Sequence, residues 1–240
     1  MPQHFLVFQH TEWEGPGRFF LKAAERCGIE LTIIKLWQEK IPSLSLYDAL
    51  VVLGGKPNVS QEEAYPFLKE EKRAIKKSLT DDRPYFGICL GHQLLADALG
   101  ATIGDNYCVS VGFVDGFLTG KGKEHPLFNN FPPRLPLFKW HCQTVLEPTP
   151  RSIEILATSS DCQIEAISVK GRPHIVGVQF DNNSSAVQNI QTYLDEDAQW
   201  LASKHRTSVN PAAIMNYAKR ERVVLARHFR TLLSNFVKLT

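Results

Sequence analysis

The chain reads PYFGICLGHQ over residues 84–93. Residues 85–88 form an apolar run typical of a buried strand, and a helical pattern begins directly after Cys89. Glycines at positions 87 and 91 permit a tight strand-to-helix turn around this cysteine. The free N–H groups at a helix N-terminus lower a thiol pKa and can bind a developing oxyanion. We expect Cys89 to be a nucleophile; the alternative is a small buried side chain that only packs.

Short apolar segments alternate with helical patterns through the first hundred residues. This alternation predicts a parallel sheet covered by helices on both faces, which is a three-layer α/β fold. Ligands of such folds bind at the carboxyl ends of the strands. The predicted strands are 5–8, 31–36, 49–53 and 85–88, and the predicted helices are 16–27, 66–79 and 90–99.

After residue 100 the pattern changes to strands without intervening helices. We expect these strands to be antiparallel additions to the same sheet. A helical pattern then runs from 184 to 201, polar residues continue to 210, and a last helix is predicted over 211–238, whose apolar spacing favours packing over partner binding. We expect residues 1–194 to form one domain and residues 195–240 a helical C-terminal extension packed on it. The predicted later strands are 111–118, 135–140, 153–157, 163–169 and 174–180.

Composition excludes several classes of function. A chain of 240 residues that is 43% hydrophobic can bury a full core, and a net charge of +2 offers no strong field for nucleic acid or an anionic membrane. Five cysteines without a C-x-x-C pair argue against a disulfide framework or a zinc site and fit a reducing cytoplasm. No run approaches the roughly 18 apolar residues of a membrane span. We expect a cytoplasmic protein without metal or cofactor.

Three segments together resemble the class I glutamine amidotransferases in order and spacing. They read VVLGG at 51–55, GICLGHQ at 87–93 and GVQF at 177–180, with weaker similarity in HPLF at 125–128 and KWH at 139–141. The resemblance covers roughly residues 5–194. It implies an enzyme that releases ammonia from the side-chain amide of glutamine.

The resemblance also implies a role for each motif residue. Cys89 would attack the amide carbon, form a glutamyl thioester and expel ammonia. The backbone N–H of Leu90, with that of Gly54 or Gly55, would bind the oxyanion, because glycines let backbone donors approach a ligand closely. Gln93 would line the glutamine pocket.

The last motif departs from the family pattern. Family members end this strand in His-Pro-Glu, whose His and Glu complete the catalytic triad, whereas this chain has Asp181 and Asn183 at those positions. In extended chain these two side chains point the same way. An ionised Asp181 would repel a thiolate, and Asn183 has no imidazolium to orient.

Another histidine could serve as the base. His174 stands seven residues before Asp181, about 23 Å away in extended chain and near the opposite end of the strand, so we expect it to be an exposed turn residue. His141 matches a polar pocket residue of the family, and His92 lies almost one helical turn after Cys89, where packing is the expected role. Either of these two as a substitute base stays open.

Three functions follow. The first is a glutamine amidotransferase domain with weak glutaminase activity, whose ammonia would pass to an acceptor enzyme on a separate chain. The second is a pseudoenzyme that binds glutamine, a γ-glutamyl compound or a partner without turnover. The third is a hydrolase of γ-glutamyl or other activated acyl substrates.

Overall fold

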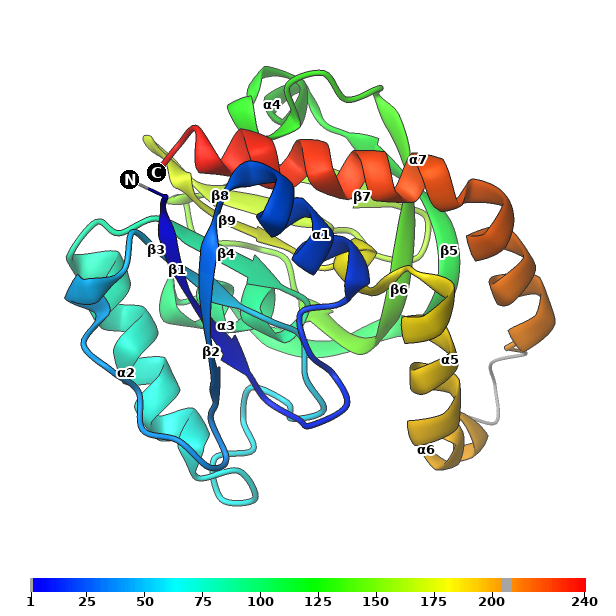
Figure 1. The fold of residues 1–240 in the computed structure, drawn as a ribbon, viewed down its shortest axis with the longest axis horizontal. Coiled ribbons are helices and arrows are strands. Elements are labelled where there is room, and N and C mark those ends of the chain that lie inside the picture. The colour runs from blue at the N-terminus through cyan, green and yellow to red at the C-terminus, as the bar shows by residue number, and fades with distance from the viewer. Residues whose placement is uncertain (1, 204–208) are drawn as a thin grey trace.

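The computed structural model describes residues 2–203 and 209–240, and its centre is a single sheet. Within those residues nine strands pair in the order β2-β1-β3-β4-β9-β8-β7-β5-β6 (Figure 1). The first five strands of this order are mutually parallel, and the remaining pairs are antiparallel. The predicted α/β fold, with antiparallel additions after residue 100, is confirmed.

The parallel strands lie close to their predicted positions because the three central ones contain continuous apolar runs that are buried on both faces. One end differs, since the last strand stops at Val178 rather than at Phe180. The chain bends there, and residues 182–184 form a 3-10 turn. The parallel strands are β1 (His4–Gln9), β2 (Glu30–Lys35), β3 (Ala49–Val52), β4 (Tyr85–Ile88) and β9 (Arg172–Val178).

Two antiparallel strands are longer than their apolar runs. The segment 103–110, in which glycine and polar residues interrupt the apolar ones, continues the strand because residues 103–105 and Ser110 pair with residues 141–145, with a register shift between Asp105 and Ser110. Conversely, β8 starts three residues later than predicted because residues 159–162 turn, with Cys162 N donating to Ser159 Oγ. The antiparallel strands are β5 (Ile103–Leu118), β6 (Arg134–Val145), β7 (Ile153–Ser159) and β8 (Ala166–Val169).

Helices cover both faces of the sheet. Helices α1 (Arg18–Cys27) and α7 (Pro211–Val237) pack on one face, and α2 (Phe67–Thr80) and α3 (Leu90–Ala98) pack on the other (Figure 1). The helix predicted over 184–201 is interrupted at Asp197, and part of the polar segment before residue 210 lies outside the described residues. The shorter helices are α4 (Gly120–Glu124), α5 (Val187–Glu196) and α6 (Ala198–Ser203), and the 3-10 segments are η1 (Leu44–Leu46), η2 (Pro126–Phe128) and η3 (Asn182–Ser184).

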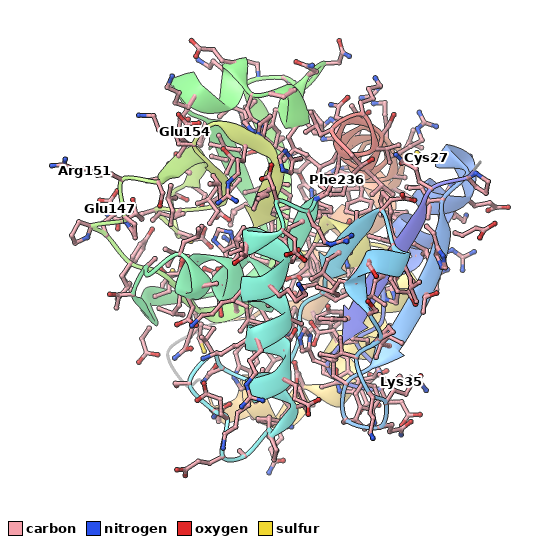
Figure 2. The ribbon with its side chains drawn as sticks, turned by 90° about the vertical axis from the view of Figure 1, so that its left-hand side faces the viewer. Cys27, Lys35, Glu147, Arg151, Glu154 and Phe236 are labelled. Atoms are coloured by element: carbon pink, nitrogen blue, oxygen red, sulfur yellow. The ribbon has the colours of Figure 1, made fainter. Side chains whose placement is uncertain are left out.

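The long α7 contributes to the main core. The ring of its Phe236 lies 5.9 Å from that of Phe5 and 5.2 Å from that of Phe86, between the helix and the sheet. Figure 2 shows Phe236 inside the molecule, with Glu147 and Arg151 at its periphery. Full burial of such a side chain contributes about 1.5–3 kcal/mol. The division of the chain at residues 194 and 195 stays a prediction.

Candidate active site

Cys89 lies at a strained turn between β4 and α3. Its φ of 49° and ψ of −104° are unusual for a residue with a side chain, and such backbone strain costs about 1–3 kcal/mol. The glycines around it fill tight positions: a Cβ on Gly91 would stand 2.1 Å from the carbonyl oxygen of Val52, and one on Gly87 would stand 2.4 Å from that of Gly91. The Cys89 N–H donates to the Val178 carbonyl at 2.8 Å. The turn is therefore fixed by packing against both neighbouring strands.

Loops that follow four parallel strands meet at this thiol. A Cβ on Gly54, after β3, would lie 2.6 Å from Glu14 Oε1, 3.2 Å from Asp181 Oδ1 and 3.4 Å from Cys89 Cβ. Residue 54 must therefore be glycine if these three side chains are to meet. The sequence motifs included Gly54, Cys89 and Asp181, but Glu14 belongs to a loop after β1 that carries no motif.

The loop that holds Gly54 is anchored by a buried histidine. His10 Nδ1 donates to the Gly54 carbonyl at 2.8 Å, and its Nε2 lies 2.8 Å from Glu71 Oε1. Burial lowers the pKa of His10, but the Glu71 carboxylate outweighs this and raises it overall. An imidazolium can donate at both nitrogens, so His10 ties this loop to α2.

Two carboxyl groups lie beside the thiol. Burial raises the pKa of Asp181 to about 8, although Lys139 opposes the shift. Burial also raises the pKa of Glu14 to about 8, with repulsion from Asp181 as the next cause, and the Tyr193 hydroxyl donates to Glu14 Oε1 at 3.1 Å. Contrary to the expectation of an ionised Asp181, the pair holds protons at neutral pH.

The thiol itself is a poor nucleophile in this setting. Burial raises the pKa of Cys89 well above its ordinary value, and the charges of Asp181 and Glu14 raise it further. The Leu90 N–H acts in the expected direction and lowers it, but less strongly. Gln179 Nε2 lies 3.6 Å from Cys89 Sγ and donates to it. At neutral pH Cys89 is therefore a thiol rather than a thiolate.

Asn183 points elsewhere. Ser184 N donates to the Asp181 carbonyl at 2.8 Å, which closes the turn of η3, so the alternation of an extended strand does not apply here. Asn183 Nδ2 donates to the Pro16 carbonyl at 3.0 Å and to Ser184 Oγ at 3.1 Å. Of the two residues at the family's His and Glu positions, only Asp181 reaches the thiol.

A small cavity of about 90 Å³ opens at Cys89, and we name it the Cys89 pocket. Of the predicted site residues, Gly55, Leu90, Gln93 and His141 line it with Cys89. Gln93 Nε2 donates to the Gln143 carbonyl at 2.9 Å and to Gln179 Oε1 at 3.1 Å, so Gln93 supports the Gln179 amide that contacts the thiol. The remaining lining residues are Glu14, Lys56, Pro57, Asn58, Trp140, Cys142, Gln143, Asp197 and Trp200.

The two candidate substitute bases occupy different places. His141 Nδ1 donates to the Gln143 carbonyl at 2.9 Å, which leaves Nε2 unprotonated, buried and without a hydrogen-bond partner among the described residues. Burial, then Lys139, holds the pKa of His141 well below its ordinary value. Burial lowers the pKa of His92 to about 3, and a Cβ on Gly177 would lie 2.9 Å from its Nδ1. His92 thus packs against β9, and only His141 lines the pocket.

Further charged residues lie at this site, and of these only Lys139 belongs to a segment quoted in the sequence analysis. Lys56 and Asp197 line the pocket, and Asp197 Oδ2 accepts a hydrogen bond from Trp140 Nε1 at 2.9 Å. Deeper inside, Lys139 forms a buried ion pair with Glu165. Over residues 2–203 and 209–240 no cluster of side chains could hold a metal ion, and no helix is long and apolar enough to cross a membrane.

Comparisons with known proteins agree with this geometry. The chain is 34% identical over 146 residues to the glutamine amidotransferase-like protein YfeJ of Salmonella typhimurium, a match that covers 59% of this chain and 60% of that protein. It is 38% identical over 119 residues to one of the subunits of the glutamine-hydrolysing GMP synthase of Methanocaldococcus jannaschii, covering 48% of this chain and 58% of that one. The chain spans about three-fifths of the length of these curated relatives.

A solved structure matches the chain from end to end. The crystal structure of a glutamine amidotransferase from Thermotoga maritima has a TM-score of 0.87 and 28% identity, and the match covers 99% of each chain. A family model described as glutamine amidotransferase class-I matches residues 18–197, a range that includes Cys89 and Asp181. On the fold, the cysteine turn and these matches, the chain belongs to the class I glutamine amidotransferase family.

Proposed function

We propose that this chain binds glutamine or a γ-glutamyl compound in the Cys89 pocket and hydrolyses it far more slowly than an enzyme with an imidazole base. One observation carries the proposal: the group beside the buried Cys89 thiol is the carboxyl of Asp181. The alternatives of a binding pseudoenzyme and of a hydrolase for more activated acyl substrates differ from this only in turnover and leaving group.

The charges of the pocket suit an amino acid. Lys56 and Asp197 both line it, so one cation and one anion are available for the carboxylate and the ammonium group of a zwitterion. Leu90 and Gly55 line the same cavity, and their N–H groups would bind the oxyanion. A side-chain amide that reached Cys89 would meet these donors at the carboxyl ends of the strands.

The missing imidazole limits two steps. An ordinary cysteine with a pKa near 8.5 is about 3% thiolate at pH 7, and a raised pKa lowers this population tenfold per unit. Expulsion of ammonia then needs a proton. Here Asp181 and Glu14 are carboxyl groups beside the thiol that hold protons, while His141, with an unprotonated Nε2, lines the pocket. Loss of general acid–base catalysis costs about 10² to 10⁴ in rate.

The proposal also includes an acceptor enzyme for the ammonia and a location in the cell. Since some relatives are named as components of a glutamine-hydrolysing GMP synthase, we infer that any ammonia released here is used by an acceptor enzyme on another chain. We also place the protein in the cytoplasm, because all five cysteines are free. We propose neither nucleic acid nor a membrane as a binding partner.

The decisive experiment measures binding and turnover separately. Calorimetry with Cys89→Ala should detect glutamine binding, and Lys56→Ala should weaken it, whereas asparagine, one methylene shorter, should bind less well. Ammonia release by the natural chain should lie well below the ordinary enzyme range of about 1 to 10³ s⁻¹. The matched control is Cys27→Ala, a partly buried cysteine outside the site, which should change neither quantity. Cysteine-dependent turnover within that range would refute the proposal of slow hydrolysis, and absence of glutamine binding would refute the ligand.

A further inference from the structure

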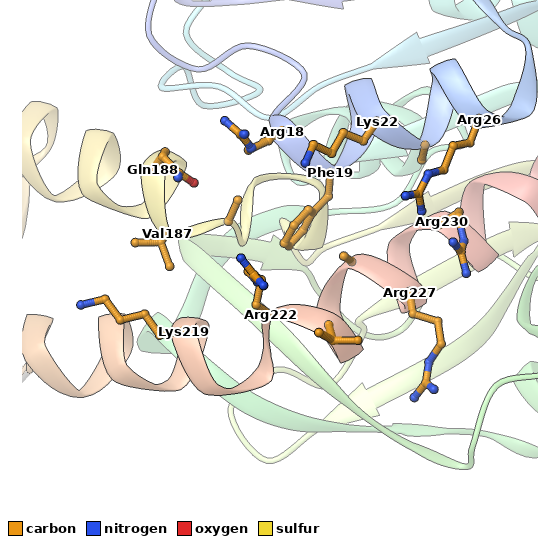
Figure 3. Close-up of a pocket in the computed structure, with 14 residues that line it drawn as sticks. Arg18, Phe19, Lys22, Arg26, Val187, Gln188, Lys219, Arg222, Arg227 and Arg230 are labelled. Carbon is orange, nitrogen blue, oxygen red and sulfur yellow. The ribbon is translucent and has the colours of Figure 1, made fainter.

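A second cavity, of about 720 Å³, lies between α1 and α7 beside the start of α5 (Figure 3). We name it the basic groove. Half of the residues that line it are cations, and none of them is acidic. The cations are Arg18, Lys22 and Arg26 on α1, with Lys219, Arg222, Arg227 and Arg230 on α7.

These cations are not neutralised by the part of the chain that the structure describes. No ion pair joins any of the seven to a carboxylate of the described residues, and all seven side chains are exposed. The neighbouring acidic residues on the same helices do not neutralise these cations: Glu25 does not line the groove, and Glu221 pairs with Arg220 at 2.8 Å. Like charges gathered within about one Debye length, roughly 8 Å, repel one another. Folding alone does not account for such a cluster on a chain whose net charge is only +2.

The two helices carry these charges in two rows, of which some side chains face the space between the helices while Arg227 points away from α1 (Figure 3). Arg18, Lys22 and Arg26 are four residues apart, so they repeat about every 6 Å along α1, and the α7 row from Lys219 to Arg230 spans about 16 Å. Figure 3 shows Lys22 and Arg222 directed into the space between the helices. A ligand in the groove would therefore meet cations on both sides.

The floor between the rows is apolar. Phe19 reaches from α1 into the space between the helices (Figure 3), and Val187 and Val223 line the same groove. At one end lies the first turn of α5, which has no acidic residue and no capping side chain, so its N–H groups add to the positive potential. The floor thus consists of the small part of Phe19 that is exposed, 7% of the residue, together with Val187 and Val223, next to a dense positive charge.

We propose that the basic groove binds a small organic polyphosphate of the nucleoside triphosphate class, with its phosphates between the two rows and its ring system on the Phe19 floor. The volume lies within the range of about 300–1,000 Å³ that is usual for small-molecule sites. Five of the seven cations are arginines, whose planar forks bind phosphate oxygens in pairs. A triphosphate supplies several negative charges over a short length, whereas an acidic peptide supplies about one charge per residue.

The test uses the full chain and compares ligands that separate the two parts of the proposed molecule. ATP, inorganic tripolyphosphate, AMP and adenosine would be titrated calorimetrically at two salt concentrations. We expect ATP and tripolyphosphate to bind, AMP to bind at least about tenfold more weakly and adenosine not to bind, with affinity falling as salt rises. Tighter binding of ATP than of tripolyphosphate would support the apolar floor as the site of the base, and equal binding would overturn that part of the proposal.

Charge reversal locates the site. The double variant Lys22→Glu with Arg222→Glu should weaken ATP binding by about tenfold or more, since each lost charge-assisted contact is worth roughly that factor. The matched control, Arg73→Glu with Lys76→Glu, changes the same charge at two exposed positions on α2, on the opposite face, and should shift the Kd less than about twofold. The milder Arg222→Ala should show a smaller loss in the same direction.

Three results would overturn the proposal. These are a Kd for ATP above about 1 mM in the natural chain, equal losses in the groove and control variants, and binding of a polyglutamate peptide or an RNA oligonucleotide at Lys22 and Arg222 when ATP does not bind. Circular dichroism of each variant shows whether it is folded. Because the assay needs neither Cys89 nor glutamine, its outcome is independent of the proposed function.

Discussion

Replacing Asp181 by asparagine should make the Cys89 thiol more reactive. The exchange keeps the shape of the side chain but removes the carboxylate that, after burial, is the largest cause of the raised thiol pKa. Asp181 Oδ1 and Cys89 Cβ both lie within 3.4 Å of one point, the Cβ position of Gly54, so the two groups are close. At about 4 Å and an effective dielectric constant of about 20, two unit charges repel by about 4 kcal/mol. Solvent and Glu14 reduce the net effect of this repulsion. At a pH where Asp181 is ionised, we therefore expect the exchange to raise the population of Cys89 thiolate by about ten- to a hundredfold.

The assay follows the rate of iodoacetamide modification of each cysteine peptide by mass spectrometry between pH 7 and pH 10. At pH 9, above the pKa of about 8 for Asp181, the Asp181→Asn variant should modify Cys89 about tenfold faster than the natural chain. At pH 7 the difference should shrink, because Asp181 is then largely protonated. Asp195→Asn, an exchange at an exposed site on α5, controls for net charge. Equal Cys89 rates in Asp181→Asn and the natural chain at pH 9 would show that burial alone suppresses the thiol.

Three further changes test other parts of the argument. Asp181→His should raise cysteine-dependent ammonia release, by up to about 10² to 10⁴ if the imidazole reaches the thiol, and adding Asn183→Glu should contribute nothing, because residue 183 faces Pro16 while Glu14 is the carboxyl near position 181. The pKa of Asp181 is about 8 in the folded chain and about 4 in the unfolded chain, so Asp181 destabilises the fold progressively as the pH rises above 4. In thermal unfolding, the Tm of Asp181→Asn relative to that of the natural chain should therefore rise from pH 5 to pH 9. A Tm difference independent of pH would mean that Asp181 ionises freely in the folded chain. Phe236→Ala should lower the free energy of unfolding in urea by about 3–5 kcal/mol, since its ring packs between Phe5 and Phe86, and a loss below about 1 kcal/mol would show that α7 is not part of the core.

The sequence predicted the fold well because the decisive signals are local. β4 was located to the residue, since an apolar run ends at a cysteine whose neighbouring glycines permit a turn. The segment 103–110 is not predicted, for the opposite reason: Gly104, Asp105 and Asn106 interrupt its apolar residues, and it continues the strand because residues 141–145 supply the pairing partners. Such pairing partners lie more than thirty residues away and leave no local pattern.

The sequence predicts site residues only where a residue with a chemical role also belongs to a recognisable motif. Cys89 and Gly54 belong to recognisable segments, and the structure brings them together. Glu14 and Asp197 carry no local signal, because they reach the pocket from irregular chain after β1 and from the break between α5 and α6. The turn at η3, which directs Asp181 toward the thiol and Asn183 toward Pro16, depends on the Ser184 hydrogen bond rather than on strand alternation.

The protonation state of the carboxyl pair decides what this variant of the family site can do. If Asp181 and Glu14 were both ionised, two buried negative charges beside Cys89 would exclude a thiolate and disfavour any oxyanion. With pKa values of about 8, both carboxyl groups instead retain protons at neutral pH. Protonation removes the repulsion without creating a base. Under the proposed function, the residue that weakens the nucleophile therefore still lets a neutral side-chain amide approach the thiol.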